Sequence, residues 1–118
     1  MRQKVFMKKY NKLVRDKVVP NLVAQGLSVK WHRASAEEYA RALFRKLVEE
    51  AQELEAATTV VAQMEEMGDV LDVLSAIKKL FPGQWEDLLI MQTMKRLNKG
   101  RFEDRVILDE CPPPPEKK

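Results

Sequence analysis

The chain has little of the residue types on which several common kinds of site depend. It contains one cysteine, one histidine and four glycines among 118 residues. The single cysteine, Cys111, excludes a disulfide within the chain and fits a reducing cytoplasm. The single histidine, His32, excludes a metal cluster built on several histidines. No serine or cysteine stands with a recognisable base partner, so the sequence gives no sign of a residue that forms a covalent intermediate.

Long apolar runs are also absent. No stretch is long enough for a transmembrane helix, and the basic, polar start lacks the apolar core of a signal peptide. No zinc-ligand pattern and no interleaving of aromatic with basic residues indicates specific nucleic-acid readout. The sequence therefore predicts a cytoplasmic protein with no membrane partner and no specific nucleic-acid partner.

The length predicts one domain, at residues 1–110, followed by a proline-rich tail at 111–118 that is extended and disordered. A hydrophobic content of 45% is enough for a core. Two or three helices enclose a core poorly, however, so we expect a second copy of the chain to complete it. The prediction is a homodimer or homotetramer.

Apolar periodicity predicts a mainly α fold of the antiparallel helical hairpin or bundle type. Ser35 with Glu38 forms a capping-box signature at the start of the first long helix. Alternating residues at 28–33 and 101–108 predict two strands that would pair in a short two-stranded sheet. The expected helices are a short piece at 20–25, two long helices at about 35–57 and 61–80, and a third at about 84–98.

Four carboxylates stand in two pairs, one on each long predicted helix. Glu50 and Glu53 are three residues apart, as are Glu66 and Asp69, so each pair projects from one side of its helix. Both pairs lie at the margins of apolar faces, where a carboxylate is costly unless a cation or hydrogen-bond donors satisfy it. If the helices pack together, the four side chains form a site for Mg²⁺ or Mn²⁺. The alternative is that each pair belongs to a solvated helix face.

Gly68 lies between these carboxylates, inside the second long helix. A glycine there costs about 1 kcal/mol relative to alanine. Close approach of the first long helix would explain it. The alternative is that the cost is simply tolerated.

The net charge of +3, from 21 basic and 18 acidic residues, is unevenly distributed. Basic residues dominate the first 17 positions and return at 95–101, whereas acidic residues gather in the middle. An acidic metal site flanked by basic segments suits a polyphosphate, because the cation and the basic groups can share its charge. The alternative is a generic basic surface.

Three motifs together resemble a known family. The run Glu49-Glu50-x-x-Glu53 followed by Glu66-x-x-Asp69 resembles the motif of the all-α nucleoside triphosphate pyrophosphohydrolase superfamily, which includes MazG, dimeric dUTPases and phosphoribosyl-ATP pyrophosphohydrolase. The segment 10–18 resembles the Asn-Lys-Leu-Val-Arg-Asp-Lys-Ile-Pro opening of MazG-related, phosphoribosyl-ATP pyrophosphohydrolase-like proteins, and 99–108 resembles their Arg-Gly-Gly-Phe-Glu-Lys-Arg-Ile-x-Leu close. The resemblance spans residues 10–108.

The resemblance implies Mg²⁺-dependent hydrolysis between the α- and β-phosphates of a nucleoside triphosphate, as in house-cleaning enzymes. Glu49 would orient water as a base or sit behind the metal ligands. The implied metal ligands are Glu50, Glu53, Glu66 and Asp69, with Mn²⁺ as an alternative ion. The implied substrate-binding residues are Lys12, Arg15, Lys17, Lys95, Lys99 and Arg101.

Some positions depart from the family pattern. Pro20 comes one residue late, and Arg101 stands where a second glycine is usual. The gap between the acidic pairs is short. Two other functions stay open at this point: a phosphoribosyl-ATP pyrophosphohydrolase, and a non-catalytic nucleotide- or nucleic-acid-binding module.

Overall fold

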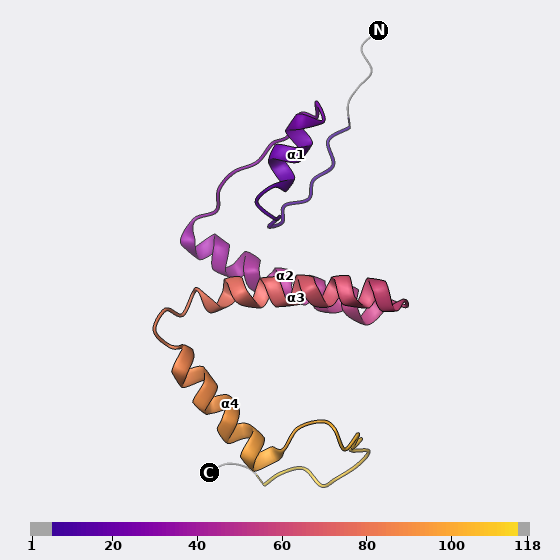
Figure 1. Ribbon diagram of the computed structural model, residues 1–118, viewed down its shortest axis with the longest axis vertical. Helices are drawn as coiled ribbons and strands as arrows, with labels where there is room; N and C mark the ends of the chain where they lie inside the picture. Colours follow the sequence, from indigo (N-terminus) through magenta and orange to yellow (C-terminus); the bar gives the residue numbers. More distant parts are fainter. Residues whose placement is uncertain (1–5, 116–118) are drawn as a thin grey trace. The chain divides into compact units, whose positions relative to one another are not determined.

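Residues 6–115 are described by the computed structural model, and within that range the chain is mainly α-helical, with four helices and no strand. The mainly α prediction is therefore confirmed, and all the expected helices form with small shifts at their ends. The helices are α1 (Val18–Ala24), α2 (Ala36–Ala56), α3 (Val60–Lys78) and α4 (Trp85–Lys99) (Figure 1). None of these helices has the length and apolarity needed to cross a membrane.

The start of α2 uses half of the predicted capping box. The Ser35 hydroxyl accepts a hydrogen bond from the backbone N–H of Glu38 at 3.2 Å, which satisfies one free donor of the first turn. The Glu38 carboxylate instead pairs with His32 Nε2 at 2.9 Å. Glu38 therefore ties the segment before α2 to its first turn, a role that the capping-box signature does not predict.

Helices α2 and α3 pack side by side as an antiparallel hairpin (Figure 1). The connection is three residues long, and side-chain hydrogen bonds satisfy a backbone group at each of its ends. Thr59 Oγ1 accepts from the N–H of Ala62 at 3.1 Å, and Gln63 Nε2 donates to the carbonyl of Ala57 at 3.3 Å. This tight turn sets the register that brings the acidic segment of α2 opposite that of α3.

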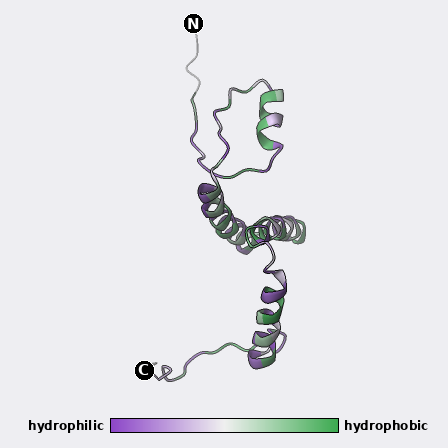
Figure 2. Cartoon of the chain, turned by 90° about the vertical axis from the view of Figure 1, so that its left-hand side faces the viewer, coloured by the Kyte–Doolittle hydropathy of each residue, from purple (hydrophilic) through white to green (hydrophobic). Residues whose placement is uncertain are grey.

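The hairpin buries very little apolar surface by itself. Leu43, at 2% exposure, is the one buried hydrophobic residue among those the structure describes. Most of the predicted apolar face of α3 is exposed, and Figure 2 shows hydrophobic residues along both long helices. The large apolar side chains left exposed on the hairpin include Phe44, Val48, Val60, Val61, Met64, Met67, Leu71 and Leu74.

Neither predicted strand is present. Residues 28–33 form no strand or bridge, and 101–108 contain a bend and a turn. Arg105 has φ 57°, in the left-handed region, so a continuous extended strand cannot pass through it. An alternating pattern forms a half-buried strand only where a second strand pairs with it through backbone hydrogen bonds. No such strand is present among residues 6–115.

Close approach of the first long helix as the explanation for Gly68 is also wrong. A Cβ at this position would have no heavy atom within 4 Å beyond its own helix and chain neighbours. The helices therefore do not approach each other there closely enough to require glycine.

The chain divides into two compact units, one ending at Pro82 and the other beginning at Gly83. The first contains α1 and the α2–α3 hairpin. In the second, α4 ends where the N–H of Gly100 donates to the carbonyl of Arg96 at 2.8 Å and Gly100 adopts φ 78°. Residues 101–115 that follow are irregular, and 116–118 of the predicted tail lie outside the described range.

Candidate metal centre

Three of the predicted carboxylates meet on the hairpin. Glu50 and Glu53 come from α2 and Glu66 from α3, and each offers an oxygen within 4.8 Å of the others. The i, i+3 spacing places the first two on one side of α2, and the short turn brings Glu66 opposite them. Carboxylate oxygens at this separation match the donor type that Mg²⁺ and Mn²⁺ prefer.

Two of these carboxylates are incompletely satisfied. Glu50 is 6% exposed, and its Oε2 is buried with no hydrogen-bond partner in the described chain. The same holds for Oε2 of Glu66. Glu53 is exposed, so the cluster is buried on one side and open on the other. An orphaned buried carboxylate oxygen is expensive, and a cation entering from the open side would satisfy both atoms. The donor set therefore fits a hard divalent cation.

The electrostatics of Glu66 agree with this geometry. Burial, followed by the neighbouring carboxylates Glu50 and Glu53, raises the pKa of Glu66 from 4.5 to about 7. Three carboxylates so close together cannot all hold a negative charge cheaply without a counter-ion. Near neutral pH, Glu66 then carries a proton for part of the time in the metal-free protein.

A pH dependence of stability follows. Since the pKa of Glu66 in the folded chain, about 7, exceeds its ordinary value of 4.5, its protonated form stabilises the fold below pH 4.5. That contribution is lost as pH rises through 7. With a chelator present, the melting temperature should fall between pH 5 and pH 8 by more in the native sequence than in Glu66→Gln. Mg²⁺ at pH 8 should restore the melting temperature of the native sequence. If the melting temperatures of the two proteins change with pH in the same way, the raised pKa of Glu66 is contradicted.

Asp69, the fourth predicted ligand, lies outside the cluster. Its Oδ1 accepts a hydrogen bond from Nη2 of Arg15 at 2.6 Å, while Nη1 of Arg15 donates to Oδ2 of Asp72 at 2.7 Å. One guanidinium thus bridges two carboxylates that are three residues apart on α3. The sequence analysis did not single out Asp72. Its spacing from Asp69 is the only signal that could have found it.

Glu49 is held by two lysines. Lys12 Nζ lies 2.9 Å from its Oε1 and Lys46 Nζ lies 3.5 Å from its Oε2. The hydrogen bond from Lys12 is the main reason that the pKa of Glu49 is below its usual range. Lys46 also lies 3.4 Å from Oε1 of Glu50, which leaves the second oxygen of Glu50 free. Sequence reasoning missed Lys46, although its i, i+3 and i, i+4 spacing to these glutamates was visible.

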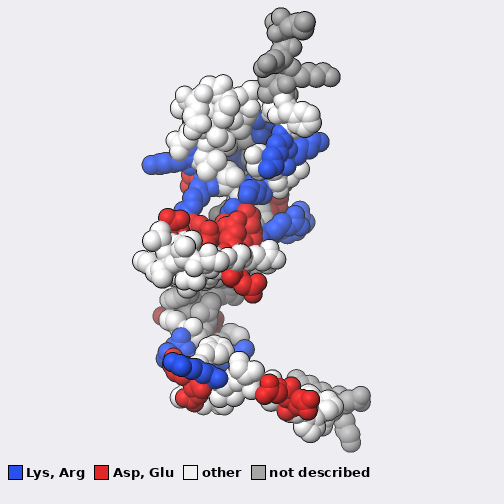
Figure 3. All heavy atoms as spheres, turned by 90° about the vertical axis from the view of Figure 1, so that its right-hand side faces the viewer, with Lys and Arg blue, Asp and Glu red and all other residues white. Residues whose placement is uncertain are grey.

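Basic and acidic side chains consequently lie next to each other on the first unit, as Figure 3 shows. Lys17, the third predicted basic residue of the opening, makes no ion pair among residues 6–115. The remaining predicted substrate-binding residues belong to the second unit: Lys95 and Lys99 on α4, and Arg101 just after its glycine cap.

Comparisons with known proteins do not assign the chain to a family. A scan against protein-family models, a search of curated proteins and a search of solved structures each found no match.

Proposed function

We propose that this protein is a Mg²⁺-dependent nucleotide pyrophosphohydrolase that cleaves between the α- and β-phosphates of a nucleoside triphosphate, giving a monophosphate and pyrophosphate. The observation that carries the proposal is the convergence of Glu50, Glu53 and Glu66, with two buried carboxylate oxygens that lack a partner. The substrate class rests on the three motifs at residues 10–108 that resemble this superfamily.

A bound Mg²⁺ would supply a more acidic water and neutralise charge on the attacked phosphate. Glu50 and Glu66 would hold it from the buried side and Glu53 from the open side. Glu49 would orient water rather than remove its proton, because its lowered pKa makes it a weak base. The two lysines on Glu49 fix that carboxylate in place.

The basic residues would neutralise the phosphate chain and the departing pyrophosphate. The residues that the resemblance implies for this role are Lys12, Arg15, Lys17, Lys95, Lys99 and Arg101. Charge grows on the leaving pyrophosphate as the bond breaks, so cations placed there stabilise the transition state more than the ground state.

We also propose that the protein is cytoplasmic, because its one cysteine is free and exposed.

The test is a pyrophosphate-release screen across nucleoside triphosphates and phosphoribosyl-ATP, each with Mg²⁺ and with Mn²⁺. Release from one or more nucleoside triphosphates that depends on the divalent cation is the expected result. Release from phosphoribosyl-ATP alone would move the function to that substrate. Nucleotide binding with no turnover at either cation would contradict hydrolysis and favour a non-catalytic binding module.

We also propose that the active form is a homodimer or homotetramer. Because Leu43 is the one buried hydrophobic residue among residues 6–115, the exposed apolar face of the hairpin needs another surface, and a second copy offers an identical one.

Light scattering at micromolar concentration should therefore report at least a dimer. Leu71, 58% exposed on α3, is a suitable position to test this assembly. Leu71→Lys should shift it toward monomer, because an interface buries a charge poorly. Lys78→Arg, on the same helix, keeps the charge and should not change the assembly. A native chain that is monomeric and fully active would contradict the proposal.

A further inference from the structure

The N-terminal arm, residues 6–17, is attached to both helices of the hairpin by charged contacts. Lys12 binds Glu49 of α2 at 2.9 Å. Arg15 binds Asp69 and Asp72 of α3 at 2.6 and 2.7 Å. These contacts lie directly beside the three-carboxylate cluster, since Glu49 precedes Glu50 and Asp69 follows Glu66 by three residues.

We propose that Arg15 is a positioning residue that withholds Asp69 from the metal centre and exchanges this carboxylate for phosphate when a nucleotide binds. The proposal deepens the proposed function and rests on it. Its consequence is that the arm couples nucleotide binding to completion of the metal site by a fourth carboxylate.

The position of Asp69 on α3 supports the first half of this inference. An i, i+3 pair projects from one side of a helix, so the backbone already places Asp69 beside Glu66. What distinguishes the two side chains is their partner. Glu66 turns to the cluster and has a free oxygen, whereas Asp69 is bound to the Arg15 guanidinium. Release of the guanidinium would leave Asp69 an unpaired carboxylate next to a cation site.

The exposure of the ion pairs supports the second half. The side chain of Arg15 is 59% exposed, and those of Asp69 and Asp72 are 36% and 65% exposed. Ion pairs this open to water contribute little stability and exchange easily. A polyphosphate offers the same planar guanidinium a bidentate acceptor with more negative charge. Since the two partners compete for one guanidinium, phosphate binding and release of Asp69 are linked.

The test uses the full chain and two separate titrations, one with Mn²⁺ alone and one with tripolyphosphate in the presence of a chelator. Arg15→Gln should tighten Mn²⁺ binding by about threefold to tenfold, as expected for adding one weakly competed carboxylate ligand. The same variant should weaken tripolyphosphate binding. Arg41→Gln is the matched control, because Arg41 pairs with Glu37 within α2 at 3.4 Å, and it should change neither titration.

If Arg15 exchanges partners, Arg15→Gln tightens Mn²⁺ binding and weakens tripolyphosphate binding. If Arg15 has only a structural role, the variant weakens both kinds of binding or neither. In the background of Asp69→Asn, Arg15→Gln should no longer tighten Mn²⁺ binding if the effect acts through this carboxylate. Unchanged Mn²⁺ affinity in Arg15→Gln, or equal tightening with Asn at position 69, would overturn the inference and leave the metal centre intact. Absence of Mn²⁺ binding to the native chain and to every variant would overturn the proposed function as well.

Discussion

Replacing Glu66 by glutamine should lower cation-dependent pyrophosphate release on the order of 100-fold or more. Loss of a group that only supports a metal ligand typically costs 10- to 100-fold, so loss of a direct ligand should reach at least the upper end. The amide keeps the shape of the side chain but lacks the anionic oxygen that a hard cation prefers. Glu53→Gln should have a similar effect, because Glu53 completes the open side of the cluster.

We expect this decrease in activity without a loss of folding. In the metal-free chain the pKa of Glu66 is about 7, so a neutral amide resembles the protonated side chain that the fold already accommodates. Glu66→Gln should therefore match or exceed the native melting temperature at pH 8 with a chelator, while losing the stabilisation that Mg²⁺ gives.

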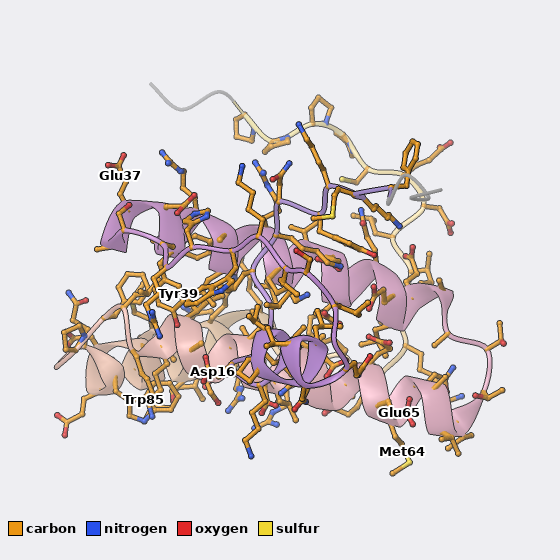
Figure 4. All side chains as sticks on the ribbon, turned by 90° about the horizontal axis from the view of Figure 1, so that it is seen from above. Asp16, Glu37, Tyr39, Met64, Glu65 and Trp85 are labelled. Atoms are coloured by element: carbon orange, nitrogen blue, oxygen red, sulfur yellow. The ribbon has the colours of Figure 1, made fainter. Side chains whose placement is uncertain are left out.

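Glu65→Gln is the matched control. Glu65, labelled in Figure 4, is the exposed neighbour of Glu66 on α3 and has no hydrogen bond or ion pair within the described part of the chain. It should retain native activity. Full activity in Glu66→Gln, or an equal loss in Glu65→Gln, would contradict the centre as described.

Lys95→Ala should lower turnover by roughly 10- to 1000-fold, as expected for removing one electrostatic stabiliser of a transition state. Lys95 and Lys99 are four residues apart on α4, so both can face one phosphate chain. Because the charge they meet grows as the bond breaks, the variant should affect turnover more than Mn²⁺ affinity.

Lys30→Ala removes the same charge from an exposed position outside the proposed site and serves as the control. The competing explanation is that the α4 lysines only solvate the end of a helix. In that case Lys95→Ala and Lys99→Ala would both keep native kinetics at saturating Mg²⁺, and phosphate binding would fall to Lys12, Arg15 or Arg101.

Local patterns explain what could be predicted from the sequence. The boundaries of α2 and α3 follow from apolar periodicity and from the caps Ser35 and Thr59, which act within a few residues. The approach of Glu50 and Glu53 to Glu66 follows from two local spacings and one short turn. Each of these features depends on neighbours along the chain.

Long-range partners explain what could not be predicted. Asp69 is bound to Arg15, which lies 54 residues earlier in the chain, and no spacing rule connects the two residues. The strand predictions failed for a related reason, because alternation marks a surface that can pair but does not supply the pairing strand. The sequence left two explanations open for Gly68, and the structure excludes a close contact there.

The most direct test of the central claim is a titration of the native chain with Mn²⁺, followed by electron paramagnetic resonance of the free ion. Saturable binding at one site per chain is expected, with affinity reduced at least about tenfold in Glu66→Gln and unchanged in Glu65→Gln. No saturable binding, or the same affinity in all three proteins, would contradict a metal centre at Glu50, Glu53 and Glu66.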